Sequence, residues 1–378
     1  MKFQCEKYVL DNAAAIAARA AAAKSPVAAL EGLFLQASLG GEDGSGVLRI
    51  TGYDLKKGIF ADIPADVSEA GGLVLPAKMF GDIVRKLPDG IVTLTADKNY
   101  KTHISCAKAD YDIMGSDPED YPELPDVEDH TIDLEMKQEL LGRMIRQTLF
   151  AASDNESRPI YTGALMECNE GRLTMVTLDG YRLAIRRENA ESCSAESCSV
   201  IVPGTALSEV EKLCTSEEGN VRMSVGRKHV CFRLNGVTLI SRKLEGEFLN
   251  YHKAVPTEFS IRLKAQRTDM IRCAERVSLI IDDRSKNPLH CLFGNGSLNI
   301  SSATALGRAE DNCPTEGDGK DTLIGLNNSY FLQALKAAPA DRLLVNINNG
   351  NSPCVFLPED GNDSFAYMIL PVRLRAEG

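Results

Sequence analysis

Hydrophobic and polar positions along the chain follow the same order of periodicities three times. Each of three segments starts with a short alternating stretch that predicts a strand, continues with a period of 3.6 residues that predicts a helix, and breaks at a proline before the next strand. The segments are KFQCEKYVLDNAAAIAARAAAAKSPVAALEGLFLQA, HTIDLEMKQELLGRMIRQTLFAASDNESRPIYTGALMEC and EFSIRLKAQRTDMIRCAERVSLIIDDRSKNPLHCLFGN. Their prolines, Pro26, Pro159 and Pro288, lie roughly 130 residues apart, which indicates one module repeated three times.

The second half of each module also repeats, as strand, helix, turn, strand, turn and strand. In LVLPAKMFGDIVRKLPDG, the predicted helix carries Met79, Phe80, Ile83, Val84 and Leu87 at helical spacing. Each module therefore holds two helices and many strands. Helices that cover one face of antiparallel sheets predict an α+β fold made of three repeated domains.

Two stretches rich in proline and polar residues separate the modules, PEDYPELPDVED at 118–129 and NYHKAVPT at 250–257. Linkers have this composition, so we predict domains at 1–127, 128–256 and 257–378. The first helix is very rich in alanine, which suits a helix lying close on a sheet; a low-complexity segment without structure is the alternative. Asp11 or Asn12 is a candidate cap at its start.

Composition narrows the class of protein. The 378 residues are 44% hydrophobic and carry a net charge of −11, which argues against a uniformly basic surface for nucleic acid but allows a local basic patch. No apolar run approaches the roughly 18 residues of a membrane helix, and the N-terminus lacks a signal-peptide pattern. Most of the eleven cysteines, such as Cys231 and Cys291, sit singly in apolar runs, which predicts reduced thiols in a cytoplasmic protein rather than a disulfide framework.

Motifs for catalysis, metal or cofactor are not found in the sequence. The five histidines are scattered, and the CSAESC stretch at 193–198 has no second cysteine pair at ligand spacing, so an exposed loop is favoured there over a zinc site. Phosphate-binding, dinucleotide-binding and nucleophile-elbow patterns do not occur. The acidic stretches at 117–129 and 153–159 are expected to be solvated. We therefore predict a binding protein without a cofactor rather than an enzyme.

Two short motifs remain. TLDGYRLA at 177–184 predicts a hairpin in which Asp179 accepts hydrogen bonds within the turn. YMILPVRL at 367–374 alternates, so residues 367, 369, 371 and 373 would face one way and the others the opposite way. Pro371 is expected to stop this strand and leave an open edge. The run is therefore either only the last core strand or also the wall of a binding site.

These two motifs resemble signatures of the bacterial sliding clamps, the beta subunit family of DNA polymerase III. RPIYTG, EDYPELP, LEGEFLNYHKAVP and the opening MKFQCEK are similar to that family in matching order. The resemblance implies a head-to-tail homodimeric ring with helices inside and sheets outside, which encircles duplex DNA without sequence preference. It also implies partners: the polymerase III alpha subunit, the clamp loader, and other polymerases and repair proteins with clamp-binding peptides. The sequence departs from the family pattern at Leu178, at Leu249 and in the last four residues, Arg375 to Gly378.

The resemblance implies that the edge left at Pro371 meets the TLDGYRLA segment. With the helix positions, it also assigns residues to three surfaces. The candidates for contacts with DNA phosphates in the channel are Arg19, Lys24, Lys78, Arg85, Arg143, Arg146, Arg272 and Arg276. The candidates for a pocket that binds a partner's peptide are Tyr161, Leu178, Gly180, Tyr181, Arg182, Leu183, Leu249, Lys253, Met368, Ile369, Leu370, Pro371, Val372, Arg373 and Leu374. The candidates for the dimer interface are Tyr111 and Ile113 on an edge strand and Ile280 and Ile281 on a helix.

Two other functions stay open on the sequence. One is a protein-interaction scaffold that does not encircle DNA, and the other is a hydrolase with a diffuse site. Retention on circular DNA that is lost on linearisation would distinguish a clamp from both.

Overall fold

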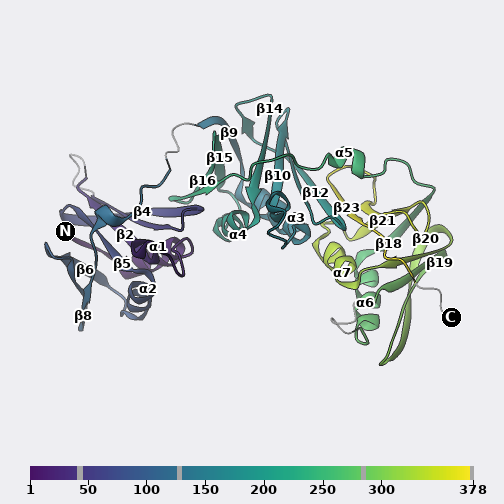
Figure 1. Ribbon diagram of the computed structural model, residues 1–378, viewed down its shortest axis with the longest axis horizontal. Coiled ribbons are helices and arrows are strands. Elements are labelled where there is room, and N and C mark those ends of the chain that lie inside the picture. Colours follow the sequence, from purple (N-terminus) through teal and green to yellow (C-terminus); the bar gives the residue numbers. More distant parts are fainter. Residues whose placement is uncertain (41–45, 126–129, 282–286, 375–378) are drawn as a thin grey trace. The chain divides into compact units, whose positions relative to one another are not determined.

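A computed structural model describes residues 1–40, 46–125, 130–281 and 287–374, and it contains three successive rounds of one series of elements (Figure 1). Each round starts with a strand and a helix, continues with further strands, and ends with a second helix and three strands. The predicted threefold repeat with two helices in each module is confirmed.

The elements of the first round are β1 (Lys2–Glu6), α1 (Lys7–Ala18), β2 (Gly32–Ser38), β3 (Gly46–Tyr53), β4 (Lys57–Glu69), β5 (Gly71–Pro76), α2 (Ala77–Lys86), β6 (Ile91–Ala96), β7 (Lys101–Cys106) and β8 (Ala109–Met114). Those of the second are β9 (His130–Lys137), α3 (Gln138–Thr148), β10 (Gly163–Asn169), β11 (Arg172–Leu178), β12 (Arg182–Asn189), β13 (Ser192–Cys193), β14 (Ser197–Pro203), α4 (Gly204–Leu213), β15 (Asn220–Gly226), β16 (His229–Leu234) and β17 (Val237–Arg242). A one-turn helix, α5 (Tyr251–Ala254), precedes the third round. That round has β18 (Ile261–Gln266), α6 (Arg267–Ser278), β19 (Leu289–Thr304), β20 (Gly307–Leu326), α7 (Asn328–Ala337), β21 (Arg342–Ile347), β22 (Cys354–Pro358) and β23 (Phe365–Ile369).

The alanine-rich segment forms helix α1, as predicted, and lies close on strands β3 and β4. A Cβ atom at Gly52 on β3 would lie 2.0 Å from the backbone carbonyl oxygen of Ala17, so only glycine allows this close approach of helix and strand. The predicted cap is wrong, because α1 already begins at Lys7 and Asp11 lies inside it, paired with the Lys7 ammonium at 3.0 Å. On α2 the apolar face is Phe80 and Val84, while Met79 is 52% exposed.

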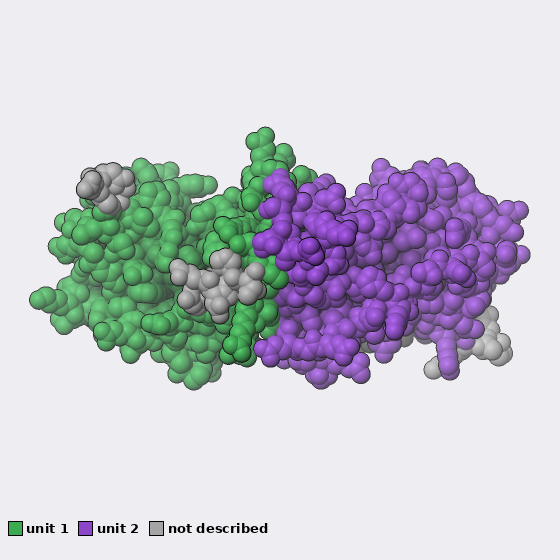
Figure 2. All heavy atoms as spheres, turned by 90° about the horizontal axis from the view of Figure 1, so that it is seen from above, with its two compact units in different colours: residues 1–139, 212–243 green, residues 140–211, 244–378 purple. Residues whose placement is uncertain are grey.

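The chain divides into two compact units, residues 1–139 with 212–243 and residues 140–211 with 244–378 (Figure 2). In the first unit, the antiparallel strand order is β9-β15-β16-β17-β4-β1-β6-β7-β8, and β3, β2 and β5 branch from β4. In the second unit the order is β14-β10-β11-β12-β23-β22-β21-β18-β20-β19.

Pairing of β17 with β4, and of β12 with β23, continues each sheet across a predicted domain boundary. The domain limits 1–127, 128–256 and 257–378 therefore stay a prediction.

Strand β23 separates two apolar cores of the second unit. On one face, Phe365, Tyr367 and Ile369 pack with residues of α6 and α7, two helices that lie side by side in Figure 1. On the other face, Ala366 and Met368 pack with residues of β10, β11, β12 and β22. Among the described residues, no helix is long and apolar enough to cross a membrane.

Candidate functional site

The two motifs of the sequence lie side by side as strands β12 and β23. Leu183 is opposite Met368 and Arg182 is opposite Ile369, and the Leu370 N–H donates a hydrogen bond to the Tyr181 carbonyl oxygen at 2.8 Å. The edge of the C-terminal run is thus paired with TLDGYRLA, as the resemblance implied. Strand β22 pairs with its second edge, with Cys354 opposite Ile369, so both edges are satisfied within the sheet.

Side chains alternate along the run as predicted. Tyr367 and Ile369 belong to the core under the helices, whereas Met368 and Leu370 belong to the opposite apolar cluster. We call this second group the seam cluster. Its buried members are Leu165, Val176, Leu178, Leu183, Ile185, Ile201, Tyr251, Val355, Ala366 and Met368.

The rim of the seam cluster is made of apolar side chains that are only partly buried: Ile160, Tyr161, Leu244, Phe248, Val255, Phe259, Leu357 and Leu370. The rings of Tyr161 and Phe248 meet edge to face, with centroids 5.5 Å apart. The hydroxyl of Tyr251 donates to a Glu167 carboxylate oxygen at 2.8 Å, and burial together with this bond raises the pKa of that hydroxyl. The rim is thus an apolar surface with few polar groups, the usual chemistry of a ligand-binding surface.

The structure brings five of the predicted pocket residues into or around this cluster: Leu178, Leu183 and Met368 as buried members, and Tyr161 and Leu370 at the rim.

The other predicted pocket residues lie elsewhere. The side chain of Leu249 is 44% exposed, and its neighbour Phe248 occupies the rim in its place. Lys253 is exposed on α5. Ile369 faces the core under the helices, because odd and even positions of β23 point to opposite sides of the sheet.

Asp179 organises the turn before β12, as predicted. Its carboxylate accepts hydrogen bonds from the Tyr181 N–H at 2.8 Å and the Arg182 N–H at 3.0 Å, while Gly180 adopts φ +95°. The turn leaves the Tyr181 side chain 65% exposed, so it is available for contact with a ligand.

Arg182 points away from the seam cluster. Its Nε donates to Asp179 at 3.0 Å, and its guanidinium also bonds Gln333 and stacks on the ring of Tyr330, 4.2 Å from the centroid. Arg182 therefore fixes the position of the turn relative to helix α7 and is not part of the apolar surface.

Beyond β23 the chain turns toward the end of β20. The Val372 N–H donates to the Gly325 carbonyl oxygen at 2.8 Å, and the Leu374 side chain packs against Gly325. Val372 and Arg373 are exposed, and Pro371 is partly buried. The predicted extra tail at 375–378 lies outside the described residues.

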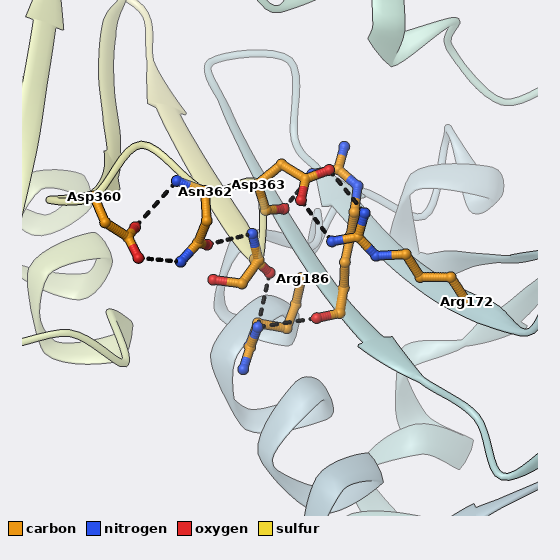
Figure 3. Close-up of polar contacts among 7 residues, drawn as sticks. Arg172, Arg186, Asp360, Asn362 and Asp363 are labelled. Carbon is orange, nitrogen blue, oxygen red and sulfur yellow. Dashed lines mark hydrogen bonds and ion pairs between the residues drawn. The ribbon is translucent and has the colours of Figure 1, made fainter.

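Hydrogen bonds and one ion pair fix the register of β23 on β12 (Figure 3). Arg172 donates two hydrogen bonds to the Asp363 carboxylate, at 2.9 and 2.6 Å, and the Arg172 guanidinium lowers the pKa of that carboxyl. Arg186 donates to the Ser364 carbonyl oxygen at 2.7 Å, and the Arg187 N–H donates to the same oxygen at 2.8 Å. These bonds tie the second round of elements to the third.

Sequence reasoning missed Phe248, Leu165 and Val355. Phe248 could have been chosen over Leu249, because an aromatic ring buries more area than its aliphatic neighbour. Leu165 and Val355 lie in the apolar runs GALM and CVFL, which do not reveal which face of a strand meets which partner.

The predicted channel cations lie on or next to helices of the three rounds, as expected. Arg85, Arg146 and Arg276 form ion pairs with Asp82, Glu211 and Asp311. Lys78 on α2 and Arg272 on α6 are exposed, Lys24 is exposed after α1, and Arg143 is exposed on α3. Arg19 caps the end of α1. Their contact with DNA stays a prediction.

The predicted interface residues lie as follows. Tyr111 and Ile113 are on β8, which ends the strand order of its sheet. Helix α6 ends at Ser278, so Ile280 and Ile281 follow the helix instead of lying on it, and Ile281 packs partly against the core. The most exposed residue of this segment is Leu279, at 85%.

Within the described ranges, no group of three or more His, Cys, Asp or Glu side chains is arranged to hold a metal ion. All eleven cysteines are free thiols, and Cys231 and Cys291 are buried.

Comparison with protein families agrees with this geometry. Residues 1–125 match the model of the DNA polymerase III beta subunit, N-terminal domain; residues 135–250 match the central domain; and residues 252–373 match the C-terminal domain.

Individual relatives agree over most or all of the chain. A beta sliding clamp from Synechocystis is 31% identical, over 99% of this chain and 100% of the relative, and one from Staphylococcus aureus is 31% identical over 86% and 88%. The solved DNA polymerase sliding clamp from Bacillus subtilis, 26% identical, superposes with a TM-score of 0.93 over 99% of this chain and 100% of that one. The chain therefore belongs to the DNA polymerase III beta subunit family, the bacterial sliding clamps.

Proposed function

We propose that the chain is a DNA sliding clamp, two copies of which close head to tail into a ring that encircles duplex DNA and tethers the replicative polymerase for processive synthesis. One observation carries this proposal. The chain pairs strands of successive rounds in the same way twice, and, among the described strands, the two that would form a third pairing of this kind each keep an unpaired edge.

Each of these pairings joins two successive rounds. The first partner is the third strand that follows the first helix of a round, and the second partner is the last strand of the next round. In this way β4 pairs with β17, from Lys57–Ser241 to Ala61–Val237. In the same way β12 pairs with β23, from Arg182–Ile369 to Arg186–Phe365.

The unmatched halves are β8, the last strand of the first round, and the first part of β20. Strands β19 and β20 pair in two segments, 289–293 with 322–326 and 297–304 with 307–314, so the first part of β20 is the third strand segment after α6. Among the described strands, β8 pairs only with β7. Along 307–314, β20 pairs only with β19, since β18 reaches no further than Thr315 and Glu316. Open strand edges invite pairing. If the same strand pairing is used a third time, β20 of one copy pairs with β8 of the next copy. This contact is heterologous, because two different surfaces meet, and it can close into a ring.

The residues that follow helices α3 and α6 also support closure of the two copies into a ring. After α3, the ring of Phe150 meets the ring of Tyr367 on β23 edge to face, with centroids 5.4 Å apart. With the 129-residue spacing from Pro159 to Pro288, Phe150 corresponds to Leu279, so Leu279 takes the place of Phe150 and Ile280 and Ile281 follow directly after it. We therefore expect Leu279, Ile280 and Ile281 to meet Tyr111 and Ile113 on the next copy.

Encirclement explains how an acidic protein holds DNA. A closed ring retains the duplex by topology, so only weak phosphate contacts are needed, and these carry no sequence preference. The net charge of −11 is then compatible with local cations on the inward helices, for which we propose the eight residues named above.

The rim of the seam cluster would receive a short peptide with leucine or phenylalanine anchors. The peptide would come from the polymerase III alpha subunit, the clamp loader or other polymerases and repair proteins. Anchors of this kind supply most of the energy of such interfaces. We expect the protein to be cytoplasmic and to have no turnover of its own.

The deciding experiment is retention on DNA. The protein is loaded onto nicked circular DNA by a bacterial clamp loader with ATP, isolated by gel filtration, and the DNA is then cut once. We expect the protein to stay with circular DNA and to leave linear DNA within minutes. Equal retention on both forms, or none on either, would contradict encirclement and favour an interaction scaffold.

A further inference from the structure

Three cysteine thiols meet at one end of the β10–β14 strand pair. Cys168 on β10 lies directly opposite Cys198 on β14, and the Cys193 thiol on β13 lies within hydrogen-bonding reach of both. Two of these cysteines belong to the CSAESC stretch, which the sequence predicted to be an exposed loop. The structure instead packs Cys193 and Cys198 half-buried around the buried Cys168.

Backbone hydrogen bonds hold the three thiols together. The Glu170 N–H, in the turn after β10, donates to the Glu196 carbonyl oxygen at 2.9 Å, and the Ala190 N–H donates to the Gly171 carbonyl oxygen at 2.8 Å. The segments that carry the thiols are therefore tied to one another.

Two of the thiols are held protonated, and the three differ in exposure. Burial raises the pKa of Cys168 to about 12 and also raises that of Cys198, so both are protonated at neutral pH. Cys193 and Cys198 are reachable from solvent, whereas Cys168 is fully buried. Cys193 adjoins Cys168 through a side-chain hydrogen bond, and Cys198 adjoins Cys168 across the strand pair.

Two other interpretations of the cysteines are weaker. The described residues contain no group placed to hold a metal, so the cluster is not a metal site. The other thiols in contact, Cys273 and Cys313, are at most 3% exposed, so an oxidant cannot reach them without unfolding.

We propose that Cys193 is a peroxide-sensitive thiol that forms a reversible disulfide with Cys168. In the first step the Cys193 thiolate attacks one oxygen of hydrogen peroxide, the O–O bond breaks, and the departing hydroxide takes up a proton to become water, which leaves a sulfenic acid. In the second step the Cys168 sulfur attacks the Cys193 sulfur, the S–S bond forms, and the S–O bond breaks. The hydroxide released takes the Cys168 proton. Two thiols lose two electrons, and one peroxide becomes two waters; a dithiol reductant reverses the reaction.

The test maps the disulfide in the full chain. The reduced protein is treated with hydrogen peroxide, its free thiols are alkylated, and it is cut by a protease specific for glutamate. Glu191 and Glu196 flank Cys193, and Glu167 and Glu170 flank Cys168, so each of the three cysteines falls on its own peptide. We expect a linked Cys168–Cys193 peptide pair that disappears after treatment with dithiothreitol.

Variants make the test specific. Cys193→Ser should abolish the linked pair, while Cys214→Ser, at a half-exposed cysteine outside the cluster, should leave its yield unchanged. Oxidised Cys193 should be recovered mainly in the link to Cys168, because the neighbouring Cys168 thiol captures its sulfenic acid, whereas Cys214 should not be recovered in such a link. A Cys193–Cys198 link without Cys168, no link at all, or a Cys168–Cys214 link in equal yield would overturn the proposal. Far-ultraviolet circular dichroism of each variant would verify the fold.

Discussion

Leu183 and Met368 lie opposite each other across the β12–β23 pair, and both side chains are at least 93% buried. The C-terminal run is thus a core strand and, through Leu370, also part of the partly exposed rim. A variant that tests binding must therefore change the rim and leave the buried pair intact.

The rim variant is Leu370→Ser. We expect it to weaken binding of a leucine- or phenylalanine-anchored clamp-binding peptide about tenfold or more, because anchors that fill apolar surfaces cost about 1–2 kcal/mol or more when truncated. The thermal midpoint should change little, since Leu370 is only half-buried. Fluorescence anisotropy measures the affinity, and Leu323→Ser, at a residue 46% exposed outside the seam cluster, is the matched control. Unchanged affinity in Leu370→Ser would remove the rim from the binding site.

Leu183→Lys, in contrast, should act on stability. Leu183 is 3% exposed, so the variant loses apolar contacts and buries an ammonium group without a partner. We expect the free energy of unfolding to fall by about 3 kcal/mol or more, and by about 2–4 kcal/mol for Leu183→Ala. Urea denaturation measures both. A Leu183→Lys protein as stable as the parent would mean that the β12–β23 seam opens to solvent.

The Arg172–Asp363 ion pair should make stability depend on pH. Arg172 lowers the pKa of Asp363 below its unfolded value, so the pair stabilises fully above the unfolded pKa and loses this effect as pH falls through the folded pKa. The difference in unfolding free energy between the parent and Arg172→Gln should be about 1 kcal/mol or less at pH 7, because both side chains are largely exposed. It should vanish in strong acid. A difference that grows as pH falls would show that another group is responsible.

Ring closure should depend on the segment after α6. We expect Ile280→Asp with Ile281→Asp to give folded monomers, because charges would replace apolar contacts across the interface. Ile281 packs partly on the core, so Leu279→Asp, at a residue 85% exposed, is the cleaner variant and should act in the same direction. Sedimentation velocity measures the mass, with Leu55→Asp as an exposed control. A dimer that persists in Leu279→Asp and in the double variant would place the interface elsewhere.

The channel prediction concerns salt dependence. Replacing Lys24, Lys78 and Arg85 together by glutamate should shorten residence on circular DNA. The slope of log K against log salt should fall by about 2.7, at about 0.9 for each phosphate contact, or by about 1.8 if Asp82 keeps Arg85 from the phosphates. Lys98→Glu, exposed in the turn after β6, is the control. An unchanged slope in the triple variant would remove these residues from the channel.

The sequence by itself determined the features that depend on neighbours along the chain. The three rounds of strands and helices, the alternation of Tyr367 to Leu370, and the turn at Asp179 all follow from periodicity and turn chemistry over a few residues.

Only the tertiary structure decided which partner each of these elements meets. It pairs β23 with β22 as well as with β12, so neither edge of this strand is open. It places Phe248 rather than Leu249 at the rim, turns Arg182 toward Tyr330, and gathers Cys168, Cys193 and Cys198. The physical reason is that strand pairing and burial join residues far apart in sequence. Local periodicity indicates that a residue is buried, but it does not indicate which face or which neighbouring residue it packs against.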